Sequence, residues 1–369
     1  MKILYDHQIF SRQQYGGISR YFHEISNRIP ALEGDKVAVF APLHVNEYGD
    51  ASNASRPSGI LAGKFPGTTV ALGIANTVAG NLLVRWRKDV SIFHETYYAT
   101  TSYAPASAKR VITVYDMIHE IFPDSFSKAD MTCRIKRRAV RRADHVICIS
   151  ESTRRDLVRL MGIPEEKTSV VYLGHSLTGP RVSAPAVPGP EHPFLLYVGK
   201  RGGYKNFKGL LAAYADSAVL RGEFNLVCFG GGKLTPGELS EMKDLGLKPG
   251  KVMCASGDDA VLAGLYVSAA ALVYPSLYEG FGIPPLEAMA HGCPVVCSNL
   301  SSLPEVVGDA ARMFDPGDQD SLREAIEQVV CSGEVSERLI LRGKEHIKHF
   351  SWDKCARETL GEYKRILGN

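Results

Sequence analysis

The sequence predicts an α/β protein built from two doubly wound domains that face each other across a cleft. Short apolar runs alternate with longer amphipathic runs in the first half of the chain, stop at a proline-rich stretch, and resume after it. Such alternation is typical of βαβ units and parallel sheets, and a length of 369 residues fits two domains better than one. Ligands bind beyond the carboxyl ends of the strands in such sheets, so the cleft is the expected site.

The elements of the N-terminal domain, residues 1–178, follow this pattern in order. Runs that predict strands lie at 2–5, 37–40, 90–94, 110–115, 145–149 and 170–172. Helical patterns lie between them, notably at 17–29 and 128–142. Ser150 follows one strand pattern and is a favourable N-cap for a further helix, because its hydroxyl can accept a hydrogen bond from a backbone N–H of the first turn.

A proline-rich segment, residues 179–193, predicts a linker between the domains. The C-terminal domain, residues 194–350, then repeats the alternation. Its strand patterns lie at 194–198, 225–229, 252–254, 271–274 and 294–297, and its helical patterns at 207–219, 260–268, 286–291 and 321–330. The last segment, 351–369, forms one amphipathic pattern, a helix expected to pack back toward the N-terminal domain.

The composition excludes several classes of protein. With 45% hydrophobic and 22% charged residues, the chain can bury two cores and is not disordered. A net charge of +3 and a pI of about 8.3 are too mild for a nucleic-acid-binding domain, which usually exceeds pI ~9. No run approaches the roughly 18 apolar residues of a membrane span, and the apolar run at the N-terminus is too short for a signal peptide. The 8 cysteines form no C-x-x-C pair and predict no metal site.

The most specific motif spans residues 278–287, which read Tyr-Glu-Gly-Phe-Gly-Ile-Pro-Pro-Leu-Glu. A strand pattern precedes it and a helical pattern follows. The turn of Gly280, Phe281 and Gly282 should therefore present N–H groups of a helix N-terminus to a phosphate. Glu279 and Glu287 flank this turn, and a nucleotide sugar, with a diphosphate and many hydroxyls, can use both. The segment predicts a sugar-nucleotide enzyme, although a single acid here could simply stabilise the helix dipole.

Two cations follow the first strand pattern of the second domain. Arg201 and Lys205 flank a glycine pair between a strand and a helix. Arginine binds phosphate oxygens bidentately and lysine adds a compact charge, so the pair would suit a diphosphate leaving group. The alternative is a solvated basic turn that caps the helix, and the glutamate motif favours the binding site over this alternative.

Other candidates lie in loops that follow further strand patterns. They are Gly16 and Gly17, Asp116 and His119, and Ser256 and Gly257. Glycine pairs occur in many turns, and a lone histidine is more often structural than functional, so the position after a strand is what supports these assignments.

Together these motifs resemble the retaining glycosyltransferases of family 4, which have the GT-B fold. Glu279 and Glu287 match the E-x7-E motif of that family, and Arg201 with Lys205 resembles its diphosphate-binding pair. The runs at 288–296 and 302–310 also read as family signature. The resemblance is specific from about residue 194 to 316 and looser before it. It extends to bacterial mannosyltransferases that build surface polysaccharides such as lipopolysaccharide.

The resemblance implies roles for these residues. In that family the first glutamate contacts the hydroxyls of the transferred sugar and the second binds the ribose, roles that would fall to Glu279 and Glu287. In the N-terminal domain a glycine loop faces the donor phosphate and the acceptor, and a histidine lies against the donor sugar. These roles would fall to Gly16 with Gly17 and to His119. Asp116, close to His119 in sequence, would orient that histidine or meet the acceptor, and Ser256 and Gly257 would help to bind the donor.

We therefore expect a retaining transferase that moves a hexose from a nucleoside diphosphate sugar, with GDP-mannose favoured, to a glycan or a lipid-linked acceptor. No cofactor and no metal are expected, since Arg201 and Lys205 would neutralise the diphosphate and no Asp-x-Asp motif stands in a matching position. Two alternatives stay open. One is a non-hydrolysing sugar-nucleotide epimerase, and the other is a catalytically inactive nucleotide-sugar-binding protein.

A basic run lies in the helical pattern at 128–142. It consists of Arg134, Lys136, Arg137, Arg138, Arg141 and Arg142. Such a run is most often a solvated helix face, and the alternative is contact with anionic lipid or a lipid-diphosphate acceptor. The scattered cysteines and the short apolar run at the N-terminus predict a cytoplasmic protein. The basic run leaves peripheral contact with the inner face of the membrane open.

Overall fold

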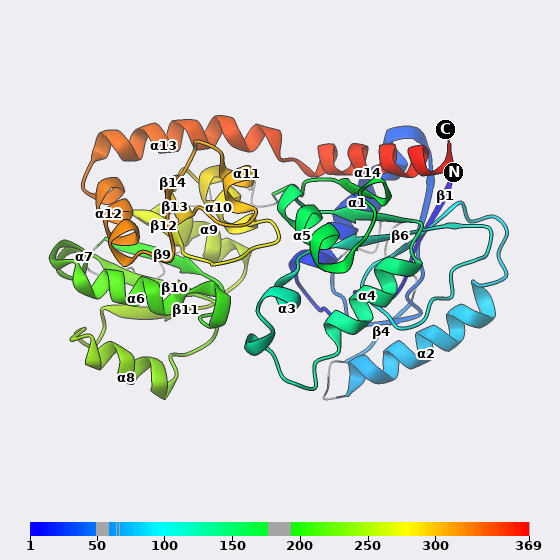
Figure 1. Cartoon of the computed structure of the whole chain (residues 1–369), viewed down its shortest axis with the longest axis horizontal. Coiled ribbons are helices and arrows are strands. Elements are labelled where there is room, and N and C mark those ends of the chain that lie inside the picture. The colour runs from blue at the N-terminus through cyan, green and yellow to red at the C-terminus, as the bar shows by residue number, and fades with distance from the viewer. Residues whose placement is uncertain (49–58, 64, 66, 176–192, 369) are drawn as a thin grey trace. The chain divides into compact units, whose positions relative to one another are not determined.

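The structure, a computed structural model, describes residues 1–48, 59–63, 65, 67–175 and 193–368. The chain divides into two compact units, one formed by Met1–Gly174 with Ser351–Asn369 and the other by His175–Phe350. Each is an α/β unit in which helices pack around a parallel sheet, as the sequence predicts (Figure 1). The predicted linker at 179–193 lies outside the described residues, apart from Pro193.

Six parallel strands form the sheet of the first unit, in the order β2-β1-β5-β6-β7-β8. The strands are β1 (Lys2–Tyr5), β2 (Lys36–Val39), β5 (Ile92–Glu95), β6 (Lys109–Val114), β7 (His145–Cys148) and β8 (Thr168–Val170), and a short separate pair is formed by β3 (Leu43–His44) and β4 (Ile60–Leu61). The helices are α1 (Gly17–Glu33), α2 (Thr68–Leu83), α3 (Ile118–Ile121), α4 (Thr132–Arg142), α5 (Glu151–Met161) and α14 (Trp352–Leu367). The strand order reverses between β1 and β5, the position where doubly wound sheets receive ligands.

The last helix, α14, belongs to the first unit, where it packs against α1. Its buried side includes Trp352, Leu360 and Tyr363. The Tyr363 hydroxyl lies 3.2 Å from the hydroxyl of Tyr5 and 2.5 Å from Nδ1 of His94. Burial lowers the pKa of His94 to about 3, so its ring is neutral in this network. The helix therefore contributes both apolar and polar contacts to the core of the first unit.

The second unit has its own six-stranded parallel sheet, in the order β11-β10-β9-β12-β13-β14. The strands are β9 (Phe194–Val198), β10 (Asn225–Phe229), β11 (Val252–Ala255), β12 (Ala271–Tyr274), β13 (Val295–Ser298) and β14 (Arg312–Phe314). The helices are α6 (Phe207–Asp216), α7 (Ala218–Glu223), α8 (Pro236–Asp244), α9 (Asp259–Ser268), α10 (Ile283–Ala290), α11 (Leu303–Val307), α12 (Gln319–Val330) and α13 (Gly333–His346). Here the strand order reverses between β9 and β12.

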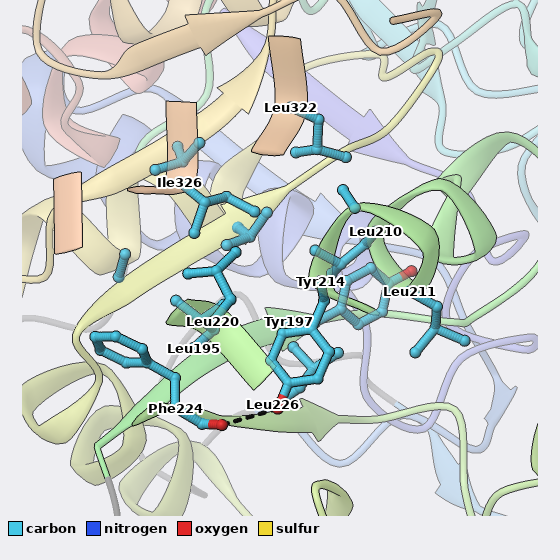
Figure 2. Close-up of a cluster of buried hydrophobic side chains, with 14 of the residues drawn as sticks. Leu195, Tyr197, Leu210, Leu211, Tyr214, Leu220, Phe224, Leu226, Leu322 and Ile326 are labelled. Atoms are coloured by element: carbon cyan, nitrogen blue, oxygen red, sulfur yellow. Dashed lines mark hydrogen bonds between the residues drawn. The ribbon is translucent and has the colours of Figure 1, made fainter. Parts of the chain in front are cut away.

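Figure 2 shows the core of the second unit, where side chains from β9, α6 and α12 meet. Leu195 and Leu210 are completely buried in it, as is Tyr214. The Tyr214 hydroxyl donates a 2.8 Å hydrogen bond to the carbonyl oxygen of Phe224, which satisfies the polar atom that this ring carries into the core. The core thus fixes the strands whose carboxyl ends carry the site loops.

The structure confirms several local predictions and corrects others. Ser150 caps α5, with its hydroxyl accepting from the Thr153 N–H. The glutamate-motif helix begins at Ile283, earlier than the predicted residue 286, because the first turn of a helix tolerates the prolines that follow Ile283. The sequence patterns do not indicate α2, α8 or α13. None of the helices in the described ranges has the length and apolar character needed to cross a membrane.

Candidate active site

Lys205 and Glu279 lie together at the carboxyl end of the sheet in the second unit. Lys205 belongs to the loop between β9 and α6, and Glu279 to the turn between β12 and α10. Because β9 and β12 are paired in parallel, the loops that follow them meet at one edge. The Lys205 Nζ is 2.6 Å from Oε1 of Glu279 and 3.3 Å from the hydroxyl of Tyr274. The structure therefore brings together two residues that the sequence assigns to one site.

The ammonium of Lys205 retains capacity to bind an anion. An ammonium has three N–H groups, and two of them donate to Glu279 and Tyr274. The side chain is 17% exposed, and Nζ lies 5.6 Å and 5.3 Å from the ring centres of Tyr204 and Tyr274. A cation held between a carboxylate and two aromatic rings is oriented but not enclosed, so a phosphate oxygen can approach it.

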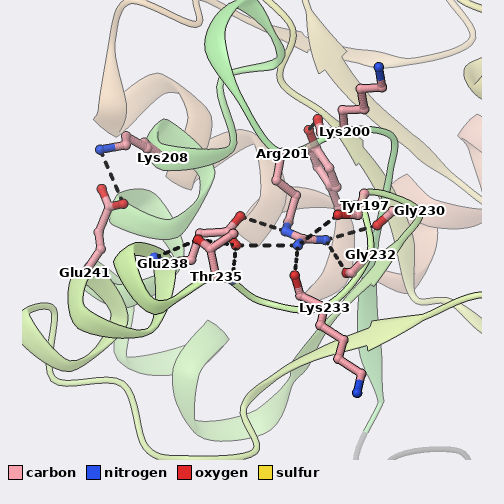
Figure 3. Close-up of polar contacts among 11 residues, drawn as sticks. Tyr197, Lys200, Arg201, Lys208, Gly230, Gly232, Lys233, Thr235, Glu238 and Glu241 are labelled. Carbon is pink, nitrogen blue, oxygen red and sulfur yellow. Dashed lines mark hydrogen bonds and ion pairs between the residues drawn. The ribbon is translucent and has the colours of Figure 1, made fainter. Parts of the chain in front are cut away.

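Arg201 has a different environment, which Figure 3 shows. Its Nε donates to Oε1 of Glu238 at 2.8 Å. Its two terminal nitrogens donate to backbone carbonyl oxygens of the loop after β10, those of Gly230 at 3.0 Å, Gly232 at 3.1 Å and Lys233 at 2.8 Å. The side chain is only 2% exposed. All three nitrogens of the guanidinium thus donate hydrogen bonds within the protein itself.

The alternative of a solvated basic turn does not hold for Arg201, because its side chain is buried. Burial alone would raise the pKa of Glu238, but hydrogen bonds from Arg201 and Thr235 outweigh it and hold the pKa below its ordinary value. Arg201 and Glu238, with side chains 2% and 15% exposed, form a largely buried ion pair that braces the loop at 230–233. A direct role of Arg201 toward a diphosphate stays a prediction.

The turn between β12 and α10 holds Glu279 in place. Gly282, the N-cap of α10, has a φ of 106°, and a Cβ there would come within 2.8 Å of a leucine side chain, so only glycine fits. The N–H of Glu279 donates to Ser301 Oγ at 2.8 Å. The Ser302 hydroxyl lies 2.9 Å and 2.8 Å from the carbonyl oxygens of Glu279 and Phe281. Gly280, Phe281 and Gly282 are all buried, and their contact with a donor stays a prediction.

Glu287 lies in the second turn of α10, not at its start. Its side chain is buried, and Oε2 accepts a 3.3 Å hydrogen bond from the Tyr266 hydroxyl of α9. Burial and the neighbouring Glu287 carboxylate raise the pKa of Tyr266, which keeps this hydroxyl protonated as a donor. Ser256 and Gly257 precede α9 in an exposed loop, directly before Asp258, whose carboxylate caps that helix. Tyr266, the partner of Glu287, thus lies near the C-terminal end of α9, whereas Ser256 and Gly257 lie just before its N-terminal end.

In the first unit, Gly16 and Gly17 begin α1 after the loop that follows β1. A Cβ on Gly16 would come within 2.5 Å of Oε1 of Gln13, whereas one on Gly17 would meet nothing. The Gln13 amide oxygen accepts from the N–H of Ser19 at 3.1 Å, so it covers part of this helix N-terminus. A side chain at Gly16 would therefore displace the Gln13 amide from this helix N-terminus, whereas one at Gly17 would displace nothing.

His119 lines a pocket of about 360 Å³ together with Phe126 and Cys133. Its ring stacks on Phe126 with 3.8 Å between ring centres, and Nε2 is 3.7 Å from Oδ2 of Asp130. Nδ1 is buried without a hydrogen-bond partner among the described residues. The acid beside His119 is thus Asp130, whose pKa is lowered chiefly by its hydrogen bonds to Thr132. Sequence reasoning named Asp116 for this position.

Asp116 is engaged elsewhere in the first unit. Its Oδ1 accepts from the N–H of Ile118 at 3.1 Å, and Lys136 Nζ donates to its carbonyl oxygen at 2.9 Å. Lys136 also pairs with Oε2 of Glu120 at 2.7 Å and is 0% exposed. Asp116 therefore belongs to the charge network around the buried Lys136 rather than to the His119 pocket, although its own side chain is 29% exposed.

The same network corrects the predicted basic face of α4. Lys136 points into the unit, because it stands three and four residues before Ala139 and Val140, which are also buried. Arg142 is held by Glu95, with nitrogen–oxygen distances of 3.1 Å and 2.6 Å. Neither cation is available to a membrane. The exposed cations of α4 are Arg134, Arg137, Arg138 and Arg141.

Three site residues escaped sequence reasoning: Tyr274, Glu238 and Asp130. Tyr274 ends the strand pattern that lies three residues before the glutamate motif, a position that could have marked it. Glu238 lies 37 positions from Arg201 and Asp130 lies 11 from His119, and no spacing rule connects such pairs. Within the described residues no group of three or more His, Cys, Asp or Glu is arranged to hold a metal ion.

Comparison with known proteins identifies the family. The family described as Glycosyltransferase Family 4 matches residues 15–178, and the one described as Glycosyl transferases group 1 matches residues 184–346. O-antigen chain mannosyltransferase B of Escherichia coli is 31% identical over 73% of this chain and 74% of its own length. O-antigen chain mannosyltransferase RfbU of Salmonella typhimurium is 30% identical, over 72% of this chain and 70% of its own.

Solved structures show the same fold. Sucrose-phosphate synthase from Thermosynechococcus elongatus superposes with a TM-score of 0.73 at 19% identity, covering 100% of this chain and 99% of its own. WaaG, a glycosyltransferase involved in lipopolysaccharide biosynthesis, superposes with a TM-score of 0.71 at 16% identity and covers 100% of both chains. With two Rossmann-like sheets and both family matches, the chain belongs to the family 4 glycosyltransferases and is a glycosyltransferase of the GT-B fold.

Proposed function

We propose that this glycosyltransferase moves mannose from GDP-mannose to a glycan or lipid-linked acceptor in the synthesis of a bacterial surface polysaccharide, with retention at the anomeric carbon. The observation that carries the proposal is the pairing of Lys205 with Glu279 at 2.6 Å beside the start of α10. The relatives support mannose, since two of them are named O-antigen chain mannosyltransferases and another MMP alpha-(1->4)-mannosyltransferase, from Mycolicibacterium hassiacum at 30% identity over 63% of this chain and 57% of its own.

In the proposed reaction the bond between the anomeric carbon and the diphosphate oxygen breaks while a bond to the acceptor oxygen forms on the same face. The departing phosphate takes the proton of the acceptor hydroxyl. Lys205 stabilises the negative charge that develops on this phosphate, and such a donor works best when it is already oriented. Glu279 accepts hydrogen bonds from sugar hydroxyls. His119 lies against the donor sugar, as the family resemblance implies.

Glu287 supplies the ribose contact in this proposal. A carboxylate can accept a pair of hydrogen bonds from the two ribose hydroxyls, and Tyr266 orients it through Oε2. Two loops are also proposed to contact the donor, the one before α9 with Ser256 and Gly257 and the one before α1 with Gly16 and Gly17.

No metal is proposed, because Lys205 already supplies a cation to the leaving group. Turnover should then be unchanged by excess chelator, and an activity that is lost with chelator and restored by Mg²⁺ would contradict this part of the proposal.

A thermal-shift panel tests the donor. Nucleoside diphosphates are compared first and their sugars second. A ligand present at ~100 times its dissociation constant should raise the free energy of unfolding by roughly 2.7 kcal/mol. We expect GDP to stabilise more than UDP, and GDP-mannose to be turned over faster than GDP-fucose. A preference for UDP, or turnover of the donor without an acceptor as an epimerase would show, would overturn the assignment.

We further propose that the enzyme works in the cytoplasm, and that the four exposed arginines of α4 contact anionic headgroups or a lipid-diphosphate acceptor at the inner face of the membrane. A surface cation contributes about 1 kcal/mol against an anionic leaflet, screened within ~8 Å. Co-sedimentation with anionic vesicles at low and high salt tests this with Arg137→Glu/Arg138→Glu/Arg141→Glu. Equal binding by this variant and wild type would show that α4 is only a solvated face.

A further inference from the structure

The helix α2, light blue in Figure 1, is inverted relative to an ordinary surface helix. Its buried positions are Leu72, Asn76 and Gly80, which recur every four residues and form one narrow stripe. Its exposed positions are Val70, Ala71, Ile74, Ala75, Val78, Leu82 and Leu83. Every exposed residue of α2 is therefore apolar, whereas the centre of the buried stripe is an asparagine. Surface helices normally show the opposite arrangement.

Polar contacts fix this orientation. The Asn76 amide nitrogen donates to Ser11 Oγ at 3.0 Å and to the carbonyl oxygen of Leu43 at 2.7 Å, and its oxygen accepts from the Leu43 N–H at 3.0 Å. Gly80 lies against the ring of Tyr103, where a Cβ would come within 2.6 Å of the ring. Rolling α2 to bury its apolar side would break all three hydrogen bonds inside the unit, so the apolar side stays outward.

The exposed apolar surface is continuous along the helix and beyond it. Val70, Ile74, Val78 and Leu82 are 67%, 62%, 55% and 71% exposed, and at about 1.5 Å per residue they form a stripe roughly 18 Å long. Phe65 before the helix and Trp86 after it are 72% and 78% exposed. Nine of the sixteen large hydrophobic side chains exposed in the described residues fall between 60 and 86. This concentration indicates a binding surface rather than scattered exposure.

The charges around this surface identify its partner. From residue 60 to residue 88 the sequence contains no Asp or Glu, and Arg85 and Lys88 are exposed beyond the C-terminal end of the helix. A protein partner would need about one hydrogen bond per 100–200 Å² of interface, which the aliphatic side chains of α2 cannot supply. A lipid surface needs none, and it accommodates a flanking tryptophan at the level of its headgroups. The next residue, Asp89, is an acid, but it pairs with Lys2 and Arg87, so Arg85 and Lys88 leave a positive charge that favours an anionic surface.

We propose that α2 is a membrane-seating helix, which lies in the plane of an anionic lipid surface with Val70, Ile74, Val78 and Leu82 in the acyl region and Trp86 and Lys88 at the headgroups. This seat is separate from the exposed arginines of α4 and does not depend on the identity of the donor. Because it is mainly apolar, its binding should persist at high salt, where purely electrostatic attachment is screened.

Tryptophan fluorescence of the full chain tests the proposal without any substitution. The chain has two tryptophans, Trp86, which is exposed, and Trp352, which is 4% exposed. Vesicles containing phosphatidylglycerol should shift the emission to shorter wavelength, and brominated acyl chains should quench it. Trp86→Phe should abolish both effects. An emission spectrum that vesicles leave unchanged at low salt overturns the proposal.

Substitutions then locate the seat. Val70→Ser/Ile74→Ser/Val78→Ser should weaken partitioning to vesicles by roughly 10- to 100-fold, because aliphatic area leaves the acyl region. The matched control is Leu341→Ser, which changes a side chain that is 65% exposed on α13 of the other unit and should leave binding unchanged. Turnover with soluble substrates should be equal in all three proteins.

Two outcomes would contradict the inference. If the triple variant binds vesicles as well as wild type while the α4 charge reversal does not, the arginines carry the attachment. If wild type is a dimer in light scattering and the triple variant a monomer, α2 is covered by a second copy of the chain instead of lipid.

Discussion

Arg201 and Lys205 lie four residues apart in one loop, and each faces a glutamate, yet they differ in what they can still bind. Arg201 is enclosed by Glu238 and four backbone carbonyl oxygens. Lys205 touches Glu279 and one tyrosine hydroxyl and is partly exposed. The difference shows that charge and position in a loop do not decide whether a cation can bind a ligand; the contacts that it makes within the folded protein do.

The largest expected effect is on stability, from Arg201→Ala. Removing the guanidinium leaves Glu238 with the hydrogen bonds from Thr235 alone and takes the donor away from the backbone carbonyl oxygens of the loop, so the free energy of unfolding should fall by about 3 kcal/mol. The matched control is Lys208→Ala, whose pair with Glu241 spans 3.5 Å with the lysine 81% exposed (Figure 3). That change should cost about 0–1 kcal/mol in denaturant titrations. A small loss of stability with a large loss of turnover would instead indicate that Arg201 binds the diphosphate directly.

Lys205→Ala should show the reverse profile. Turnover should fall about 100- to 1000-fold, by analogy with the loss of one oriented donor at a developing anion. The free energy of unfolding should fall less than in Arg201→Ala, since Lys205 is less buried. Lys200→Ala, an exposed cation of the same loop, is the control for kinetics and should retain turnover. Near-normal turnover in Lys205→Ala would remove the basis of the proposed mechanism.

Asp6 extends the comparison to a carboxylate held by neutral donors. Its Oδ1 accepts from the N–H and hydroxyl of Thr96 at 2.8 Å and 2.6 Å. Burial, followed by the charge of Glu95, raises its pKa to about 7. Protonated Asp6 therefore favours the folded state below pH ~4, and this contribution is lost as pH rises through 7.

Between pH 5 and 7 wild type should accordingly lose about 2 kcal/mol relative to Asp6→Asn, which does not titrate. Stability profiles of the two proteins across this range measure the difference. Parallel profiles would mean that Asp6 is already ionised in the folded protein and compensated.

The smallest expected effect separates the two motif glutamates. Glu287→Ala should weaken binding of nucleoside diphosphate alone by about tenfold, the loss of one charge-assisted hydrogen-bonded contact of ~1.5 kcal/mol. Glu279→Ala should keep that affinity and lose turnover with the complete donor. Calorimetric titration with GDP decides between these outcomes, and an equal loss of affinity in both variants would contradict the division of roles.

More of the fold than of the candidate site could be predicted from the sequence. Strands whose residues are apolar on both faces, such as β10 and β12, were predicted at their observed bounds, because burial in a parallel sheet imposes that composition. The helix α2 was missed because its apolar stripe faces outward and its buried stripe contains Asn76. The contact of Arg201 with Glu238 was not predicted, because that partner comes from another loop and only folding brings it to Arg201. The burial of Lys136 could have been predicted, because it is spaced three and four residues from the apolar Ala139 and Val140. Its charge led instead to the expectation of an exposed side chain.

The position of α14 has a consequence for how the protein is made. The first unit is interrupted in sequence by the whole of the second, and its core includes Tyr363 and Trp352 from the last helix. The ribosome completes residue 174 long before it supplies this helix: at 5–20 residues per second the interval is roughly 10–40 s. During that time the second unit, which is continuous, can finish folding, while α1 waits with an uncovered apolar side. The unit that is synthesised first is thus the last to finish folding. While it waits for α14, its exposed apolar surface makes it the part of the nascent enzyme that a chaperone would protect.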